Sequence, residues 1–233
     1  MTETARQLII FDCDGVLVDS EPISIEVLVD ALSAAGMPID SEMVHRRFLG
    51  RSLGAVISTA RDEYGLDINE AFLSAMRASL YDRFRAELEP MAGISEAVRG
   101  LAQENFDWCV ASSSQKERIE LSLTVTGLID CFPNIFSATM VERGKPAPDL
   151  FLFAARQMGY EPSRCIVIED SPAGVEAAKA AGMTVFAFTG GGHAKGTHYH
   201  QALLALEPDQ TFDAMADLLH LVAKTGDRDG NQP

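Results

Sequence analysis

The chain lacks several features that would mark it as a membrane or secreted protein. In its 233 residues no apolar run reaches the ~18 residues that a membrane-spanning helix needs, and the first six residues contain no apolar core of a secretion signal. The four cysteines, Cys13, Cys109, Cys131 and Cys165, include no Cys-x-x-Cys pair, and three lie in or beside apolar runs. We therefore expect buried, reduced thiols and a cytoplasmic location without a membrane span.

Positive charge is also scarce, with 19 Lys and Arg against 34 Asp and Glu and a formal net charge of −15. Such a field repels nucleic acid and anionic membranes, so we expect neither as a partner. The same field repels anionic substrates at long range. A phosphate enzyme with this charge would need a locally positive site, made by a metal ion, lysine side chains and backbone N–H groups.

Short apolar runs that end in polar residues predict a parallel sheet. Leu8-Ile9-Ile10-Phe11 is followed by Asp12, and similar runs occupy 108–111, 165–168 and 184–188, with a weaker one at 135–138. Helical patterns lie between them at 95–103, 115–126, 148–158 and 172–181. This alternation predicts an α/β, Rossmann-like core with helices on both faces and a site at the carboxyl ends of the strands.

One region interrupts this alternation. Residues 19–88 contain helical patterns at 21–35, 41–48, 53–64 and 69–84, and no convincing strand. We predict an inserted all-helical cap domain at 19–88, which would fold over the carboxyl end of the first strand. The α/β core domain would then consist of 1–18 and 89–233.

Two carboxylates stand at the end of the first predicted strand, in Asp12-Cys13-Asp14-Gly15. Residues two apart in an extended chain point to the same side, so both side chains could face one ligand. Paired carboxylates attract Mg²⁺, one of them can attack phosphorus, and the other can act as general acid and base. Asp and Gly also form ordinary turns, so the pair by itself decides nothing.

Three later segments add phosphate chemistry. Ser112 and Ser113 follow a predicted strand and precede a helix, where hydroxyl and N–H groups can hold a phosphoryl oxygen. Lys145 lies between Gly and Pro and could neutralise negative charge, and the pair Glu169-Asp170 ends another strand. Taken one at a time, the serines could be an ordinary helix cap, Lys145 a solvated loop lysine, and Glu169-Asp170 an acidic pair on the surface.

Together the segments resemble, in matching order, the four motifs of the haloacid dehalogenase superfamily, within its branch of β-phosphoglucomutase-like and sugar-phosphate phosphatase-like proteins with a helical cap. The motifs are Asp12-Cys13-Asp14-Gly15-Val16-Leu17-Val18-Asp19-Ser20, Ser112, Gly144-Lys145-Pro146-Ala147-Pro148-Asp149, and Glu169-Asp170-Ser171-Pro172-Ala173-Gly174-Val175. The resemblance covers essentially the whole chain.

The resemblance implies a role for each matching residue. Asp12 would be the nucleophile, carrying a transient aspartyl phosphate, and Asp14 the general acid and base. Asp12, Asp170 and the main-chain carbonyl of Asp14 would bind Mg²⁺, and Glu169 would lie behind the metal or reach it through water. Ser112, Ser113 and Lys145 would bind the transferring phosphoryl group.

Other chemistries of the superfamily fit less well. Dehalogenases lack the second Asp of the first motif, which is present here as Asp14. Phosphonoacetaldehyde hydrolase needs a Schiff-base lysine in its cap, and residues 19–88 contain no lysine. A catalytically silent binding protein would normally have lost the nucleophile or a metal carboxylate, and all are present.

The main rival is a β-phosphoglucomutase-like phosphoryl-transfer isomerase. That enzyme has a histidine 12 residues after its nucleophile, where this chain has Ser24. Asp19-Ser20-Glu21-Pro22 instead resembles the sugar-phosphate phosphatases. We therefore predict a phosphatase.

Substrate choice is expected to come from the cap. Arg51, in a predicted helix–helix turn, could bind a carboxylate, hydroxyl or second phosphate, with Arg47 and Glu21 as further candidates. A small phosphorylated sugar, sugar acid or polyol is the expected substrate, and we predict a monomer. The segment after the last predicted strand, from Gly190 toward His198 and His200, is predicted to be a mobile loop without a metal site.

Overall fold

The computed structural model describes residues 6–47, 53–104, 106–192 and 197–226. The chain divides into two compact units, one made of Met1–Asp19 and Glu89–Pro233 and the other of Ser20–Leu88. The first unit is an α/β fold and the second is built from helices. No helix in the described ranges has both the length and the apolar character needed to cross a bilayer.

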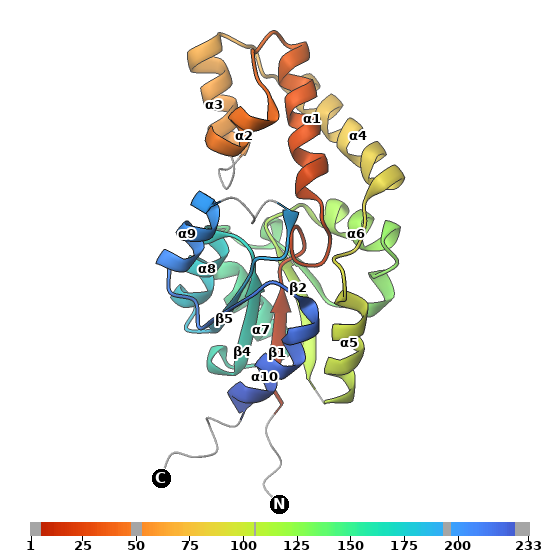
Figure 1. The fold of residues 1–233 in the computed structure, drawn as a ribbon, viewed down its shortest axis with the longest axis vertical. Helices are drawn as coiled ribbons and strands as arrows, with labels where there is room; N and C mark the ends of the chain where they lie inside the picture. Colours follow the sequence, from red (N-terminus) through yellow and green to blue (C-terminus); the bar gives the residue numbers. More distant parts are fainter. Residues whose placement is uncertain (1–5, 48–52, 105, 193–196, 227–233) are drawn as a thin grey trace, which may run out of the picture. The chain divides into compact units, whose positions relative to one another are not determined.

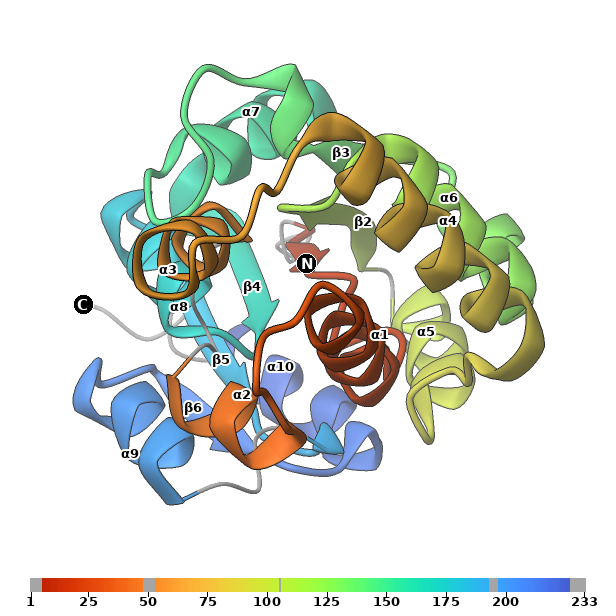
Figure 2. The ribbon, with the colours of Figure 1, turned by 90° about the horizontal axis from the view of Figure 1, so that it is seen from above.

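The α/β unit is built on a parallel sheet with the strand order β3-β2-β1-β4-β5-β6 (Figure 2). The strands are β1 (Leu8–Phe11), β2 (Asp107–Ser112), β3 (Ile135–Ser137), β4 (Cys165–Glu169), β5 (Thr184–Phe188) and β6 (Gln210–Phe212). Leu8 pairs with Asp107 on one side and Cys165 on the other. The carboxyl ends of β1, β2 and β4 therefore lie together at one edge of the sheet, with β1 between the other two.

Helices cover both faces of this sheet, as predicted (Figures 1 and 2). The helices of this unit are α5 (Ile94–Gln103), α6 (Lys116–Val125), α7 (Asp149–Met158), α8 (Pro172–Ala180), α9 (Thr197–Ala205) and α10 (Leu218–Gly226). Apolar residues of β1, β2, β4 and β5 form one buried cluster with three of the helices, α7, α8 and α9. On the other face Phe11 of β1 packs edge-on against Phe132, with ring centroids 5.8 Å apart, and Figure 2 shows α5 and α10 on that side.

The segment after β5 differs from the prediction. The predicted loop ends early, because α9 begins at Thr197 and contains both His198 and His200, while His193 lies outside the described residues. The strand β6 and the helix α10 were not predicted. β6 is three residues long and lies at the edge of the sheet, so it carries little apolar signal of its own.

The helical unit contains α1 (Glu21–Ala34), α2 (Ser41–Arg47), α3 (Leu53–Tyr64) and α4 (Glu70–Glu87). Its own apolar core consists of Ile25, Leu32, Met37, Val44, Val56, Ala60 and Ile68. Gly36 follows α1 with φ +97°, a conformation that favours glycine. Arg83 on α4 forms ion pairs with Glu26 on α1, at 2.7 Å, and with Glu87.

The chain leaves and re-enters the α/β unit at neighbouring points. The N–H of Asp19 donates to the carbonyl of Glu89 at 3.2 Å, and Val18 and Pro90 form an antiparallel bridge. The N–H of Met91 also donates to the carbonyl of Leu17 at 2.8 Å. The residues just before and just after the helical unit are thus paired with each other.

Candidate active site

A tight turn follows β1 and carries both carboxylates of the first motif. The N–H of Asp12 donates to the carbonyl of Ile168 at 3.0 Å, which ties the end of β1 to β4. Gly15 then takes φ +77°, and its N–H donates to the carbonyl of Val18 at 2.8 Å. Glycine permits this sharp departure of the chain, and the turn fixes the main chain of Asp14 close to the strand end.

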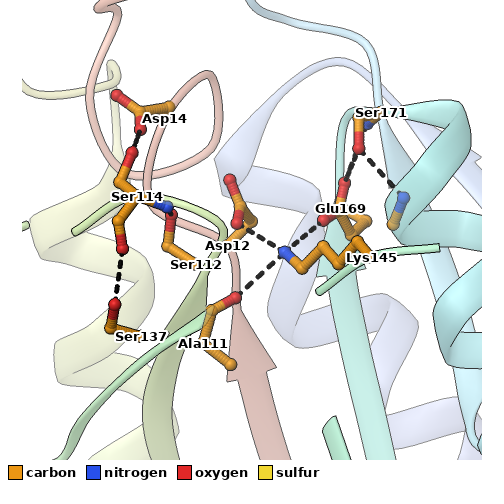
Figure 3. Close-up of polar contacts among 10 residues, drawn as sticks. Asp12, Asp14, Ala111, Ser112, Ser114, Ser137, Lys145, Glu169 and Ser171 are labelled. Carbon is orange, nitrogen blue, oxygen red and sulfur yellow. Dashed lines mark hydrogen bonds and ion pairs between the residues drawn. The ribbon is translucent and has the colours of Figure 1, made fainter. Parts of the chain in front are cut away.

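Lys145 forms the centre of a buried polar cluster (Figure 3). Its ammonium donates to Asp12 Oδ1 at 2.6 Å, to Glu169 Oε1 at 2.6 Å and to the main-chain carbonyl of Ala111 at 3.0 Å. A lysine has three N–H donors, and here each has an acceptor. The side chains of Lys145 and Glu169 are 3% and 1% exposed, so this lysine is not a solvated loop residue.

Glu169 connects this cluster to the start of α8. Its Oε2 accepts hydrogen bonds from the N–H of Ser171 at 2.8 Å and from the Ser171 hydroxyl at 2.9 Å. The same hydroxyl accepts from the N–H of Gly174 at 3.0 Å and caps the helix. A Cβ at position 174 would lie 1.8 Å from the Glu169 carboxyl carbon, so the glycine makes room for this side chain.

Burial and charge act together on the ionisation of the cluster. Burial, with the negative charges of Glu169 and Asp170, raises the pKa of Asp12 well above its usual value, while Lys145 opposes that rise. Burial by itself would lower the pKa of Lys145, but the carboxylates of Asp12 and Glu169 raise it above its ordinary value. Lys145 is therefore a permanent cation beside Asp12, in an otherwise acidic protein.

Asp14 belongs to a separate cluster on the side of β2, with partners that the sequence did not reveal (Figure 3). The Ser114 hydroxyl donates to Asp14 Oδ2 at 2.6 Å, and the Arg118 guanidinium donates to Asp14 Oδ1 at 2.8 Å. Ser137 at the end of β3 donates to the main-chain carbonyl of Ser114 at 2.7 Å. Arg118 stands 104 positions from Asp14 in the chain, so no local sequence pattern could have paired them.

The serines of the second motif lie at the end of β2. Ser112 is 1% exposed and its Oγ accepts from the N–H of Ser114 at 3.2 Å, whereas Ser113 is exposed. The helix α6 begins at Lys116, one residue after the predicted start at 115, so both serines precede the helix as predicted. The serines sit in the loop that joins the strand to the helix.

The predicted substrate-recognition residues are in or near the helical unit. Glu21 is the first residue of α1, and Arg47 is the last residue of α2. Arg51 lies outside the described residues. Their roles stay predictions.

The chemistry of the donor set fits Mg²⁺. Asp12 and Asp170 are 7% and 5% exposed, and the charge of Asp170 contributes to the raised pKa of Asp12. In the described ranges no three side chains of His, Cys, Asp or Glu converge as a metal site. Two carboxylates and the main-chain carbonyl of Asp14 would be enough to hold Mg²⁺, because water and substrate phosphate commonly supply its other ligands.

Comparisons with known proteins agree with the motifs. The family model described as haloacid dehalogenase-like hydrolase matches residues 9–188. The chain is 31% identical over 191 residues to the 6-phosphogluconate phosphatase of Escherichia coli (strain K12), and the match covers 81% of this chain and 85% of that protein.

Two crystal structures have the same fold over nearly their full lengths. One, a haloacid dehalogenase-like protein of unknown function from Agrobacterium tumefaciens str. C58, is 35% identical with a TM-score of 0.82, covering 95% of this chain and 99% of that one. The other, a hydrolase of the family from Deinococcus radiodurans R1 with bound phosphate and sodium, is 30% identical with a TM-score of 0.77, covering 96% and 98%. The chain therefore belongs to the haloacid dehalogenase-like hydrolases.

Proposed function

We propose that this chain is a magnesium-dependent phosphatase that hydrolyses a small phosphorylated metabolite through an aspartyl phosphate on Asp12. The observation that carries the proposal is the buried Lys145, whose ammonium bonds Asp12 at 2.6 Å at the carboxyl edge of the sheet. A phosphate ester needs positive charge next to the attacking oxygen, and Lys145 offers it there. The phosphate bound to the Deinococcus radiodurans relative supports an anion site in this family.

The residues divide the reaction between them. Asp12 attacks phosphorus while Asp14 gives a proton to the departing alcohol, and water then releases phosphate from Asp12 while Asp14 takes the proton back. Lys145 holds the nucleophile, and the Ser112 and Ser113 segment binds phosphoryl oxygens. Mg²⁺ bound by Asp12, Asp170 and the carbonyl of Asp14 would supply further positive charge to the phosphoryl group.

The proposed substrate class is a phosphorylated sugar, sugar acid or polyol. It follows from the resemblance of the motifs and from the Escherichia coli relative that acts on 6-phosphogluconate. The net charge of −15 argues against nucleic acid as a partner. We propose a monomeric enzyme whose helical unit selects the substrate through Arg51, Arg47 and Glu21.

Turnover of p-nitrophenyl phosphate with Mg²⁺ tests the activity. The wild type should release phosphate, a chelator should abolish release, and Asp12→Asn should lower kcat/KM by at least about 10³-fold, because the carboxylate nucleophile is lost. Equal inertness of both proteins toward a panel of phosphate monoesters would refute the phosphatase. An isomeric sugar phosphate without free phosphate as product would favour the mutase.

The same panel tests substrate recognition. Arg51→Ala should lower kcat/KM for the best substrate and leave p-nitrophenyl phosphate nearly unchanged, because a recognition residue contacts only the leaving group. Equal losses on both substrates would mean that Arg51 is needed for something other than recognition.

A further inference from the structure

The contacts of Asp14 fix its side chain from two directions. Ser114 donates to one carboxylate oxygen and Arg118 to the other, at 2.6 and 2.8 Å. Both contacts place a donor on the carboxylate, which is the arrangement of a charged acceptor group.

This ion pair is more enclosed than an ordinary surface pair. The side chains of Arg118 and Asp14 are 23% and 16% exposed, whereas the surface pair of Arg99 with Glu96 has exposures of 69% and 70%. A charged hydrogen bond in a partly enclosed site holds its geometry better than an exposed one, because water competes less for the charges.

The ion pair with Asp14 also explains why an arginine stands at this position of α6. The helix begins at Lys116, so Arg118 lies in its first turn, where the helix dipole favours acidic side chains over basic ones. The helix therefore gives no local reason for an arginine here. The carboxylate of Asp14 supplies one.

The support extends to a third strand. Ser137 is 0% exposed, and its hydroxyl donates to the carbonyl of Ser114, which fixes the loop that bonds Asp14 (Figure 3). The main chain of Asp14 is itself held by its bridge to Val18. The backbone and both carboxylate oxygens of Asp14 thus have defined positions.

We propose that Arg118 is a positioning residue that holds Asp14 as the base for the second half of the reaction. This inference rests on the proposed phosphatase function. In that half the oxygen of a water molecule bonds to phosphorus, the bond from phosphorus to the Asp12 oxygen breaks, and the proton of the water passes to Asp14. In this role Arg118 acts through Asp14 and not on the phosphoryl group.

The test separates the two halves of the reaction by rapid-quench measurement of the phosphoenzyme with p-nitrophenyl phosphate. Nitrophenolate leaves without a proton, so Arg118→Met should form the phosphoenzyme at the wild-type rate but lose it about 10- to 100-fold more slowly. In the steady state kcat and KM should fall together, with kcat/KM unchanged. Unchanged decay, or formation slowed as much as decay, would overturn the inference.

Two further variants test the ionic nature of the contact. Arg118→Lys keeps the positive charge, so its phosphoenzyme should decay at a rate between those of Arg118→Met and the wild type. If it decays as slowly as the phosphoenzyme of Arg118→Met, the charge has no role. The matched control Arg99→Met removes an exposed arginine from its pair with Glu96 and should change neither rate.

A double variant tests whether Arg118 acts through Asp14. Asp14→Asn should also slow decay, and adding Arg118→Met to it should have no further effect, since the base to be positioned is gone. Additive losses would show that Arg118 acts elsewhere. If the wild type forms no phosphoenzyme, or if Asp12→Asn still forms it, the result refutes the proposed phosphatase mechanism. The outcomes described above for Arg118 instead refute the positioning of Asp14.

Discussion

Gly174 makes a sharp prediction about the buried cluster. A methyl group at this position would lie 1.8 Å from the carboxyl carbon of Glu169 and 1.9 Å from its Oε1, whereas Cβ atoms essentially never approach another atom closer than 3.0 Å. The Glu169 side chain is 1% exposed and bonds Lys145 and Ser171, so it cannot move away from position 174 without straining or losing these bonds. Gly174→Ala should therefore displace Glu169 from its partners.

The size of the effect follows from two opposing contributions. Breaking a buried ion pair costs about 3–5 kcal/mol, and replacing glycine by alanine within a helix returns about 1 kcal/mol. We expect Gly174→Ala to lower the free energy of unfolding of the α/β unit by about 2–4 kcal/mol. At about 2–4 °C per kcal/mol for a domain of this size, its melting temperature should fall by about 5–15 °C.

Gly100 provides a matched control. A Cβ there would lie 2.1 Å from a terminal methyl carbon of Leu219, which is a similar overlap. Leu219 is only partly buried and has flexible torsions, so it can move aside. By differential scanning calorimetry Gly100→Ala should stay within about 1 kcal/mol of the wild type. The reasoning is refuted if Gly174→Ala has the melting temperature of the wild type and retains its phosphatase activity.

Two further predictions concern charge and packing. Lys145→Met should destabilise the protein by about 3–5 kcal/mol, since it leaves buried carboxylates without their cation. The pKa of Asp12 would rise further, so the folded variant retains a proton that the unfolded chain releases near the ordinary value of 3.8. In thermal melts the loss of stability relative to the wild type should therefore grow as the pH rises above that value. Lys116→Met, at an exposed lysine, should show no such deficit. In the helical unit Leu32→Ala, at a side chain 2% exposed, should cost about 2–5 kcal/mol by urea unfolding. Arg83→Ala, which removes two ion pairs at the surface, should cost only about 1 kcal/mol. Equal costs for the two would contradict a helical unit held by apolar packing.

The strands of the interior of the sheet were predictable because each combines an apolar run with a polar end. Among them β1 and β5 have the predicted limits, β4 extends one residue further at its carboxyl end, and β2 extends one residue further at both ends. The strand β6 could not be found in this way, because Gln210–Phe212 owes its pairing to β5 and not to its own composition. The carboxyl ends of parallel strands lie at the same end of the sheet, which explains how Asp12, Ser112 and Glu169 come together.

The partners within the site were less predictable than its members. Glu169 was predicted behind a metal ion, and in the structure both of its oxygens are bonded, one to Lys145 and the other to Ser171. The pairing of Arg118 with Asp14 depends on where the first turn of α6 lies relative to the turn after β1. Such pairings arise from tertiary packing, which periodicity and motif spacing do not encode.

The paired connections at Asp19 and Glu89 have a consequence for how such a protein can change. The helical segment leaves and returns through backbone positions one hydrogen bond apart, at 3.2 Å. A replacement segment would need ends as close together as Asp19 and Glu89. Its length could vary, because the entropy of closing a longer or shorter segment changes slowly with length. The junction therefore allows the whole inserted segment to be replaced by another one, while the order and register of the strands in the sheet stay the same.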